Sequence, residues 1–371
     1  MKIAFLIACC LSLTTLHAQT DHQVYHLVVA ADGTGDCTTV QQAIDAVPVN
    51  NLNQFRIFIK AGTYHEHVFI PLGKSRLSLI GEGVDRVFIT DDRKSGGPEA
   101  VPVDRGATMV VHANDVTIQG VSIVNAYGVK AQDGPQALAL YAKGDRIAID
   151  HCALLGYQDT YRTSEADNGR NYVSHSTILG AVDFIYGNGN AWLEQCTIKI
   201  NRREGGWIVA PKHQPATKWG YVFNRCTLTA DGNPAETSIW LGRPWHHQPQ
   251  TVFLHTRAEI MLPEEGWYPV MAGLPSVFAE YNTMDANGHP LDLSKRINRY
   301  YRVGEDNDTT WCTAKNVLTD EEAALYTVES VMGGEDHWQP RLIFQVPSQP
   351  FGYVLIDDKR IAVNQWGCFE R

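Results

Sequence analysis

Short apolar runs recur between about residues 55 and 260, and several share one spacing of apolar positions. Two apolar residues separated by one position are followed, three positions later, by a small or thiol residue and then by another apolar residue. Alternation of this kind indicates a β-strand with one face on a core. The clearest copies are Ile147, Ile149, Cys152, Leu154; Ala191, Leu193, Cys196, Ile198; and Tyr221, Phe223, Cys226, Leu228.

The repeat of this pattern predicts a solenoid. Its small or thiol positions fall at Val121, Cys152, Ser176, Cys196 and Cys226, with separations of 31, 24, 20 and 30 residues. A strand-rich unit of about two dozen residues with variable loops is typical of a parallel β-helix, in which each coil stacks on the one before. We therefore predict an all-β fold of this type.

Three cysteines occupy the same position of the repeat, which gives them two possible roles. Cys152, Cys196 and Cys226 would be small buried hydrophobic residues in a ladder inside the solenoid, or they would form disulfides in an exported chain. We favour the interior ladder because the repeat places all three on the core face.

A solenoid needs covered ends, and the sequence offers a helix near each one. Residues 38–48 predict an N-terminal capping helix, in which Thr38 and Gln41 fit a capping box and Pro48 ends the helix. Residues 318–324 predict a second helix with Thr319 as its N-cap. The tail from 341 to 371 returns to a strand-like pattern around 351–356, and we assign it no function.

The first 18 residues have the features of a secretory signal peptide, with Lys2 before an apolar stretch and a small residue, Ala18, at the cleavage site. Processing as a lipoprotein at Cys9 is the weaker alternative, because it leaves only about six apolar residues before the cut. No later stretch has the length of a membrane span. We expect a secreted or periplasmic protein that is not inserted in a membrane.

Composition narrows the possible functions. The 371 residues are 44% hydrophobic and 19% charged, with a net charge of −10. This balance excludes a disordered chain, and it argues against nucleic-acid binding because no basic stripe is present. CxxC, HExxH and carboxylate-rich calcium loops are absent from the sequence, so we expect no metal site and no cofactor.

Polar residues interrupt the strand-rich region at three places. Gln136 lies in the segment 134–140, Gln158 and Asp159 lie together in 156–160, and Asp183 lies in the apolar segment 182–187. Asp159 and Asp183 are 24 residues apart, about one coil, which predicts that they lie side by side. Each place alone is explained by polar side chains that end strands in turns. All three together with the segment 241–245 favour a functional site.

These segments resemble the pectin methylesterase family of carbohydrate esterases. The match rests on 29–36 (VAADGTGD), 134–140 (GPQALAL), 156–160 (GYQDT), 182–188 (VDFIYGN) and 241–245 (LGRPW), all in the family's order. The resemblance covers about residues 25–340. It implies a right-handed parallel β-helix over the domain 19–340 and hydrolysis of pectin methyl esters, with pectin as the partner of a monomeric enzyme.

The resemblance also implies a role for each site residue. Asp183 is expected to be the nucleophile, and Asp159 the general acid and then the base. Gln136 and Gln158 are expected to form the oxyanion hole with neutral amide donors. Arg243 is expected to hold Asp183 in its ionised form.

Substrate-binding positions follow less directly from the resemblance. We expect Trp245, Tyr157, Tyr161 and Tyr186 to contact the sugars. Tyr161 stands where the family usually has Leu, and Tyr186 stands where it usually has Phe. Val270 replaces a second Trp of the family's GWxxW pattern, which weakens the expected sugar platform.

Other functions remain open at this point. Two aspartates on the same solenoid could hydrolyse a glycosidic bond, but paired glutamines favour acyl chemistry over an oxocarbenium mechanism. An acyl thioesterase is a further alternative. Trp245 argues against it, because an aromatic ring at this position favours stacking on a sugar. A carbohydrate-binding β-helix without activity would not require Asp159, Asp183 and Arg243 together.

Overall fold

We analysed a computed structural model, which describes residues 25–95, 101–344, 352–356 and 359–363. The expected signal peptide, 1–18, and the alternative lipidation site at Cys9 lie outside the described residues. Among the helices that are described, none has both the length and the apolar character needed to cross a membrane.

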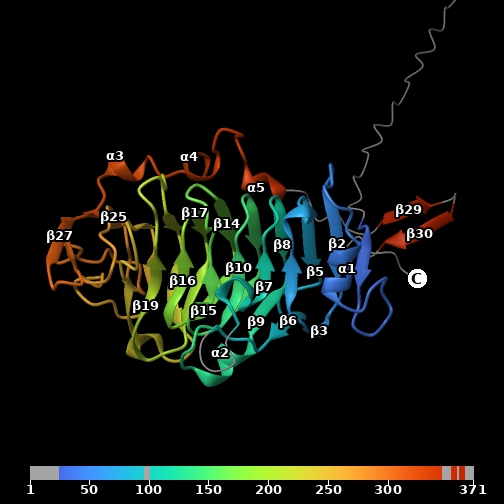
Figure 1. Cartoon of the computed structure of the whole chain (residues 1–371), viewed down its shortest axis with the longest axis horizontal. Coiled ribbons are helices and arrows are strands. Elements are labelled where there is room, and N and C mark those ends of the chain that lie inside the picture. Colours follow the sequence, from blue (N-terminus) through green and yellow to red (C-terminus); the bar gives the residue numbers. More distant parts are fainter. Residues whose placement is uncertain (1–24, 96–100, 345–351, 357–358, 364–371) are drawn as a thin grey trace, which may run out of the picture. The chain divides into compact units, whose positions relative to one another are not determined.

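Three parallel sheets wrap around a common core, and the chain passes from one to the next in the central coils (Figure 1). This arrangement confirms the predicted right-handed parallel β-helix. Sheet A has 11 strands: β1 (Leu27–Val29), β2 (Phe55–Ile59), β5 (Leu77–Gly81), β8 (Val116–Gln119), β11 (Ile147–Asp150), β14 (Arg170–Ser174), β17 (Asn190–Glu194), β20 (Tyr221–Asn224), β23 (Gln250–Leu254), β25 (Val277–Tyr281) and β28 (Lys315–Val317).

Sheets B and C, with eight and seven strands, complete the central coils. Sheet B contains β3 (Gly62–His65), β6 (Val87–Asp91), β9 (Ser122–Asn125), β12 (Ala153–Leu155), β15 (Thr177–Gly180), β18 (Thr197–Ile200), β21 (Thr227–Ala230) and β24 (Arg257–Ala258). Sheet C contains β4 (Val68–Ile70), β7 (Ala107–Val111), β10 (Leu138–Ala142), β13 (Tyr161–Arg162), β16 (Val182–Gly187), β19 (Glu204–Pro211) and β22 (Ser238–Gly242).

The corner between sheets A and B is a sharp bend at one residue. On successive coils this residue adopts a left-handed backbone, with φ between 46° and 66°, in Gly120, His151, His175, Gln195, Arg225 and His255. From Gly120 to Arg225, each is followed by one of the small or thiol positions of the sequence repeat. The repeat therefore marks this corner, where the chain turns inward and the next side chain enters the core.

The interior of the β-helix is apolar along its length, as the strand alternation predicts. Cys152, Cys196 and Cys226 are buried and free, which confirms the interior ladder rather than disulfides for these three. Towards the C-terminal end of the helix, the rings of Phe223 and Phe253 stack with their centroids 4.3 Å apart. Removing water from this continuous apolar core is the main force that holds the coils together.

Helix α1 (Val40–Ala46) covers the first coils, as predicted (Figure 1). Its buried residues Val40 and Ile44 join the main core. The capping residue differs from the prediction by one position: the side chain of Thr39, not Thr38, accepts a hydrogen bond from the Gln42 amide. Thr38 instead donates to the Gln42 side chain.

The remaining helices are short. Helix α3 (Asp320–Ala323) has the predicted N-cap, Thr319, and α4 (Val328–Met332) packs buried side chains against sheet A. The other helical segments are α2 (Ala126–Ala131), α5 (Pro340–Ile343), η1 (Leu72–Lys74), η2 (Val103–Arg105) and η3 (Pro234–Glu236).

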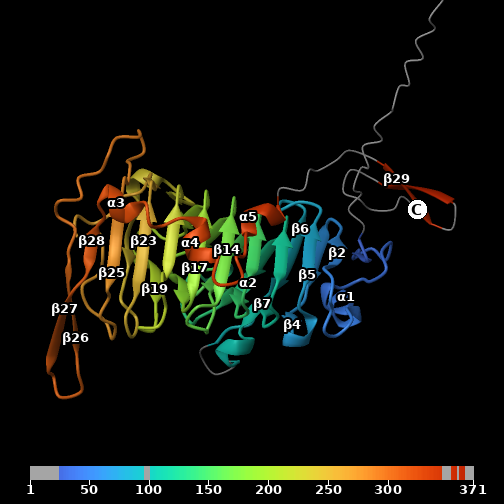
Figure 2. The same cartoon turned by 90° about the horizontal axis from the view of Figure 1, so that it is seen from above.

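Two antiparallel hairpins complete the described chain. Strands β26 (Arg299–Val303) and β27 (Thr309–Thr313) form a hairpin at the C-terminal end of the β-helix (Figure 2). In the tail, β29 (Gly352–Ile356) pairs with β30 (Lys359–Val363), in line with the strand-like pattern of its sequence.

Candidate active site

Sheet C brings the five predicted catalytic residues to neighbouring strands. Gln136 precedes β10, Gln158 and Asp159 precede β13, Asp183 lies in β16, and Arg243 directly follows β22. Gln158 pairs with Val182 in parallel register, which places Asp159 beside Asp183. Adjacent strands lie about 4.8 Å apart, so one coil of sequence brings the two carboxylates together as predicted.

The backbone at both aspartates has an uncommon conformation. Asp159 has φ 64° and Asp183 has φ 50°, in the left-handed region that few residues other than glycine adopt. The pairing of β16 with β19 also shifts here, because Val182 to Ile185 spans three steps opposite the two from Trp207 to Val209. This extra residue is a β-bulge, a feature that re-aims side chains next to active sites.

Arg243 grips Asp183 with two parallel hydrogen bonds. Its Nε donates to Oδ1 over 2.9 Å, and its Nη2 donates to Oδ2. Burial raises the pKa of Asp183 above its ordinary value, and the hydrogen bonds and charge of Arg243 oppose this increase. The arginine therefore offsets part of the cost of burying the ionised carboxylate, the form that could act as a nucleophile.

Asp159 has the opposite electrostatic character. Burial raises its pKa well above the ordinary value, and the nearby charge of Asp183 raises it further, while Tyr186, Arg162 and Arg243 act in the other direction. Asp159 therefore keeps its proton to a higher pH than an exposed aspartate. Two adjacent carboxyls, one paired with an arginine and one with a strongly raised pKa, are suited to one nucleophile and one acid.

This raised pKa predicts a measurable effect on stability. Above pH 3.8 an unfolded Asp159 releases its proton while the folded chain retains it, so stability falls as the pH rises towards the folded pKa. Asp159→Asn removes this penalty. We expect the melting temperature of the variant to exceed that of the wild type by more at pH 7 than at pH 4. An equal difference at both pH values would contradict the raised pKa.

The two glutamines are arranged as free donors. Their backbones are adjacent, because the Ala137 amide donates to the Gln158 carbonyl. Both side chains are half-buried, and neither amide group has a hydrogen-bond partner among the described residues. Donors that are half-buried and unpaired can bind an incoming oxyanion without breaking an existing bond.

The predicted substrate-binding residues occupy different environments. Trp245 is half-buried on the outer side of sheet C, where its ring meets that of Tyr186 edge to face at 5.6 Å. Tyr157 is only 6% exposed. The expectation for Tyr161 is wrong: its side chain is fully buried inside the β-helix, and its hydroxyl donates to Asn171 over 3.1 Å. Tyr161 is therefore part of the core.

Trp207 is a site residue that the sequence analysis missed. The Arg243 guanidinium lies over the Trp207 ring, 3.8 Å from its centroid. Trp207 comes shortly after the exposed residues 202–205, so the sequence does not indicate that it lies in a strand. In the structure it pairs with Val182 on the neighbouring strand. Its ring holds the arginine by a cation–π contact.

We expect Trp207→Leu to lower kcat by about 3- to 30-fold, because a cation–π contact contributes about 0.5–2 kcal/mol. If Trp207 positions Arg243, the acid limb of the pH–rate profile also moves to higher pH, since Asp183 is then held less well. Trp240→Leu is the matched control, because both rings pack on Tyr268 but only Trp207 contacts Arg243. Equal losses in both variants would assign Trp207 to packing alone.

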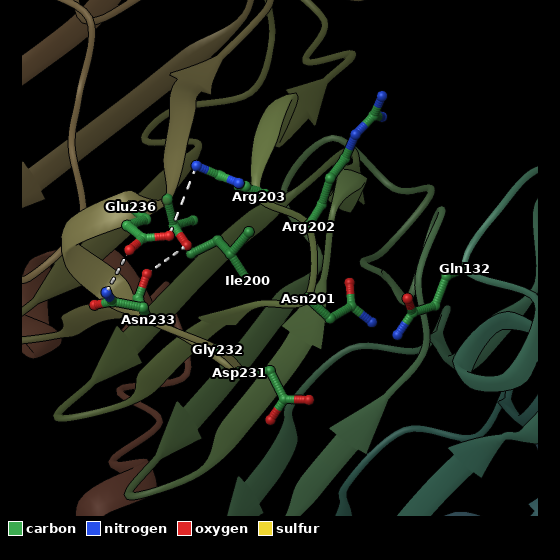
Figure 3. A pocket seen from close by; sticks show the side chains of 10 residues that line it. Gln132, Ile200, Asn201, Arg202, Arg203, Asp231, Gly232, Asn233 and Glu236 are labelled. Atoms are coloured by element: carbon green, nitrogen blue, oxygen red, sulfur yellow. Dashed lines mark hydrogen bonds and ion pairs between the residues drawn. The ribbon is translucent and has the colours of Figure 1, made fainter.

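A separate pocket lies on the loops that connect sheet B to sheet C (Figure 3). Its lining includes Arg203, which pairs with Glu236 at 3.7 Å, and Asn233, which donates to Glu236 over 3.1 Å. None of the five predicted catalytic residues lines it. The pocket is therefore distinct from the site on sheet C.

Comparison with known proteins agrees with this geometry. The pectinesterase family model matches residues 26–335. A pectinesterase of Petunia integrifolia is 30% identical, over 84% of this chain and 80% of that protein. The probable pectinesterase A of Aspergillus fumigatus is 31% identical, over 73% and 81%. The chain spans only 32% of a putative pectinesterase/pectinesterase inhibitor of Arabidopsis thaliana, with 29% identity.

Solved structures show the same fold. The pectin methylesterase from carrot superposes with a TM-score of 0.71 at 25% identity, covering 86% of this chain and 96% of that one. The pectin methylesterase PemA from Erwinia chrysanthemi superposes with a TM-score of 0.68 at 25% identity, covering 86% and 99%. The chain belongs to the pectinesterase family, a class of carboxylic ester hydrolases. The predicted family and enzyme class are thus confirmed.

Proposed function

We propose that this chain hydrolyses the methyl esters of galacturonate units in pectin through a covalent intermediate on Asp183. Family membership supports the reaction. A solved pectin methylesterase in complex with a hexasaccharide, 25% identical to this chain, supports a sugar polymer as the substrate. The observation that carries the mechanism is the pairing of Asp183 with Arg243 beside Asp159, whose pKa is raised by burial and by the charge of Asp183.

In the first half-reaction, an Asp183 carboxylate oxygen attacks the ester carbonyl carbon. The carbonyl oxygen becomes an oxyanion, to which Gln136 and Gln158 donate hydrogen bonds. Asp159 then gives its proton to the departing methoxy oxygen, and methanol leaves. The product is an anhydride between Asp183 and the galacturonate carboxyl group.

In the second half-reaction, Asp159 is a carboxylate and accepts a proton from a water molecule. The hydroxide attacks the galacturonate acyl carbon, and the bond to Asp183 breaks. Asp183 returns to its ionised form beside Arg243, and Asp159 regains the proton that it needs for the next cycle. The product forms as a galacturonic acid, which releases the remaining water proton to the solvent, so each turnover adds one negative charge to the polymer.

The enzyme acts as a monomer in the periplasm or outside the cell, where the signal peptide expected at 1–18 would direct it. Trp245 lies half-buried on the outer side of the same sheet as the carboxylates and supplies an aromatic surface for the sugars, while the ring of Tyr186, 3% exposed, packs behind it. The domain 19–340 carries this activity. We assign no function to residues 341–371.

One assay separates this function from the alternatives. Purified enzyme is incubated with highly methylated pectin, and methanol, reducing ends and bound enzyme are measured together. Methanol without new reducing ends is the result expected of an esterase. Reducing ends without methanol would indicate a glycoside hydrolase, and binding without either product would indicate a carbohydrate-binding protein.

A further inference from the structure

Buried carboxylates in this chain are normally neutralised by arginine. Among the described residues, three of them form such pairs: Asp183 with Arg243, Glu194 with Arg341, and Glu280 with Arg296. Asp159 is the fourth and belongs to the active site. The fifth, Asp150, is 3% exposed and has no lysine or arginine in an ion pair.

Two histidines take the place of that arginine. Nδ1 of His151 lies 2.7 Å from Oδ2 of Asp150, and Nδ1 of His175 lies 3.1 Å from Oδ1. The carboxylate also accepts hydrogen bonds from the Ser174 hydroxyl, at 2.7 Å, and from the Gln119 amide, at 3.2 Å. Apart from the two histidines, the hydrogen-bond partners of Asp150 are neutral. A bound cation would therefore balance the negative charge of this buried carboxylate.

The β-helix repeat is the reason that these residues meet. Asp150 ends β11, and its register partner on β14 is Ser174. The next residue of each strand, His151 or His175, occupies the left-handed corner between sheets A and B. The two imidazoles consequently stack on neighbouring coils, with ring centroids 5.0 Å apart and an interplanar angle of 20°.

We propose that Asp150, His151 and His175 bind a divalent first-row transition cation such as Zn²⁺. One ligand atom from each residue lies within 4.8 Å of the other two, so small rotations of the rings bring all three to the bond lengths of about 2.0–2.2 Å that zinc requires. The imidazole side chains are 64% and 45% exposed, which leaves them room to turn and allows water to complete the coordination.

The ligand chemistry selects the class of ion. Calcium and magnesium prefer six or more oxygen ligands, whereas two imidazoles and one carboxylate suit zinc, copper or nickel. Gln119 and Ser174 donate hydrogen bonds to the Asp150 carboxylate and so hold it in place as a ligand. The corner lies between sheets A and B, whereas the catalytic residues lie on sheet C, so this cation would have no part in ester hydrolysis.

Isothermal titration calorimetry of the full chain, without an affinity tag, with ZnCl₂ tests the proposal. We expect one saturable site in the wild type, and at least tenfold weaker binding in His151→Ala and in His175→Ala. His255→Ala is the matched control, because His255 occupies the same corner two coils beyond Gln195 but contacts Tyr281 and no carboxylate. This control should bind zinc as the wild type does.

The exposed pair His246 and His247, with ring centroids 5.8 Å apart, is the main competitor for added zinc. Loss of binding in His246→Ala/His247→Ala, with binding retained in His175→Ala, would overturn the proposal. Absence of saturable binding in the wild type would overturn it as well. Asp150→Asn is not used, because it could disturb folding. Instead, the zinc-dependent rise in melting temperature is compared between the wild type and His175→Gln. Without metal the two proteins should melt at the same temperature, and zinc should raise the melting temperature of the wild type only.

Discussion

Replacing Asp183 with asparagine is expected to reduce methanol release from methylated pectin by about 10⁴-fold or more, the range found when a catalytic nucleophile is removed. The amide of asparagine is a poor nucleophile and cannot form the anhydride intermediate. It keeps the size of the carboxylate, and its oxygen can still accept a hydrogen bond from Arg243. The fold should therefore survive, which circular dichroism and the melting temperature can verify.

Asp115 provides a close control for this variant. It also has a left-handed backbone, with φ 57°, and it also forms two hydrogen bonds with an arginine on another coil, Arg146. Asp115→Asn should keep wild-type methanol release. If Asp183→Asn does so too, the assignment of the nucleophile is wrong and the glycosidase and binding alternatives must be reconsidered.

The second large effect concerns Asp159, which in the proposed mechanism carries a proton in both half-reactions. Asp159→Asn is expected to lower kcat by about 10²–10⁴-fold, the usual contribution of a general acid or base. In the wild type, activity falls as the pH drops through the pKa of Asp183 and as it rises through the raised pKa of Asp159.

The pH–rate profile tests the assignment of these two limbs. The residual activity of Asp159→Asn should keep the acid limb, which belongs to Asp183, and lose the alkaline limb. An unchanged bell-shaped profile in the variant would show that another group supplies the proton. The profile is recorded on kcat with saturating pectin, so that substrate binding does not obscure the two ionisations.

The fold followed from the sequence because its signal is repetitive. Each coil contributes the same alternation and the same small or thiol residue, so that Cys152, Cys196 and Cys226 could be placed in the core from spacing alone. The main site residues were found through a combination of segments in family order, and the 24-residue separation of Asp159 and Asp183 matched one coil.

Features that depend on local backbone detail could not be predicted. Strand β13 has only two residues, too few to show which one faces inward, so nothing in the sequence corrected the sugar-binding role expected of Tyr161 from its motif position. The bulge at Asp183 has no sequence marker that we recognised. Likewise, Asp150 and His175 are 25 residues apart, and only the register of β11 with β14 brings them together.

The stacking of coils also determines which changes of length this enzyme can tolerate. The residues proposed to be catalytic lie on or directly beside β10, β13, β16 and β22, and their contacts depend on the strand order β10, β13, β16, β19, β22 in sheet C. A whole coil inserted between β13 and β16 would separate the two aspartates by an additional strand spacing and abolish their electrostatic coupling. A coil added before β7 or after β25 would leave every catalytic distance unchanged. The scaffold can thus lengthen or shorten at its ends during evolution while a central block of coils is inherited as a unit.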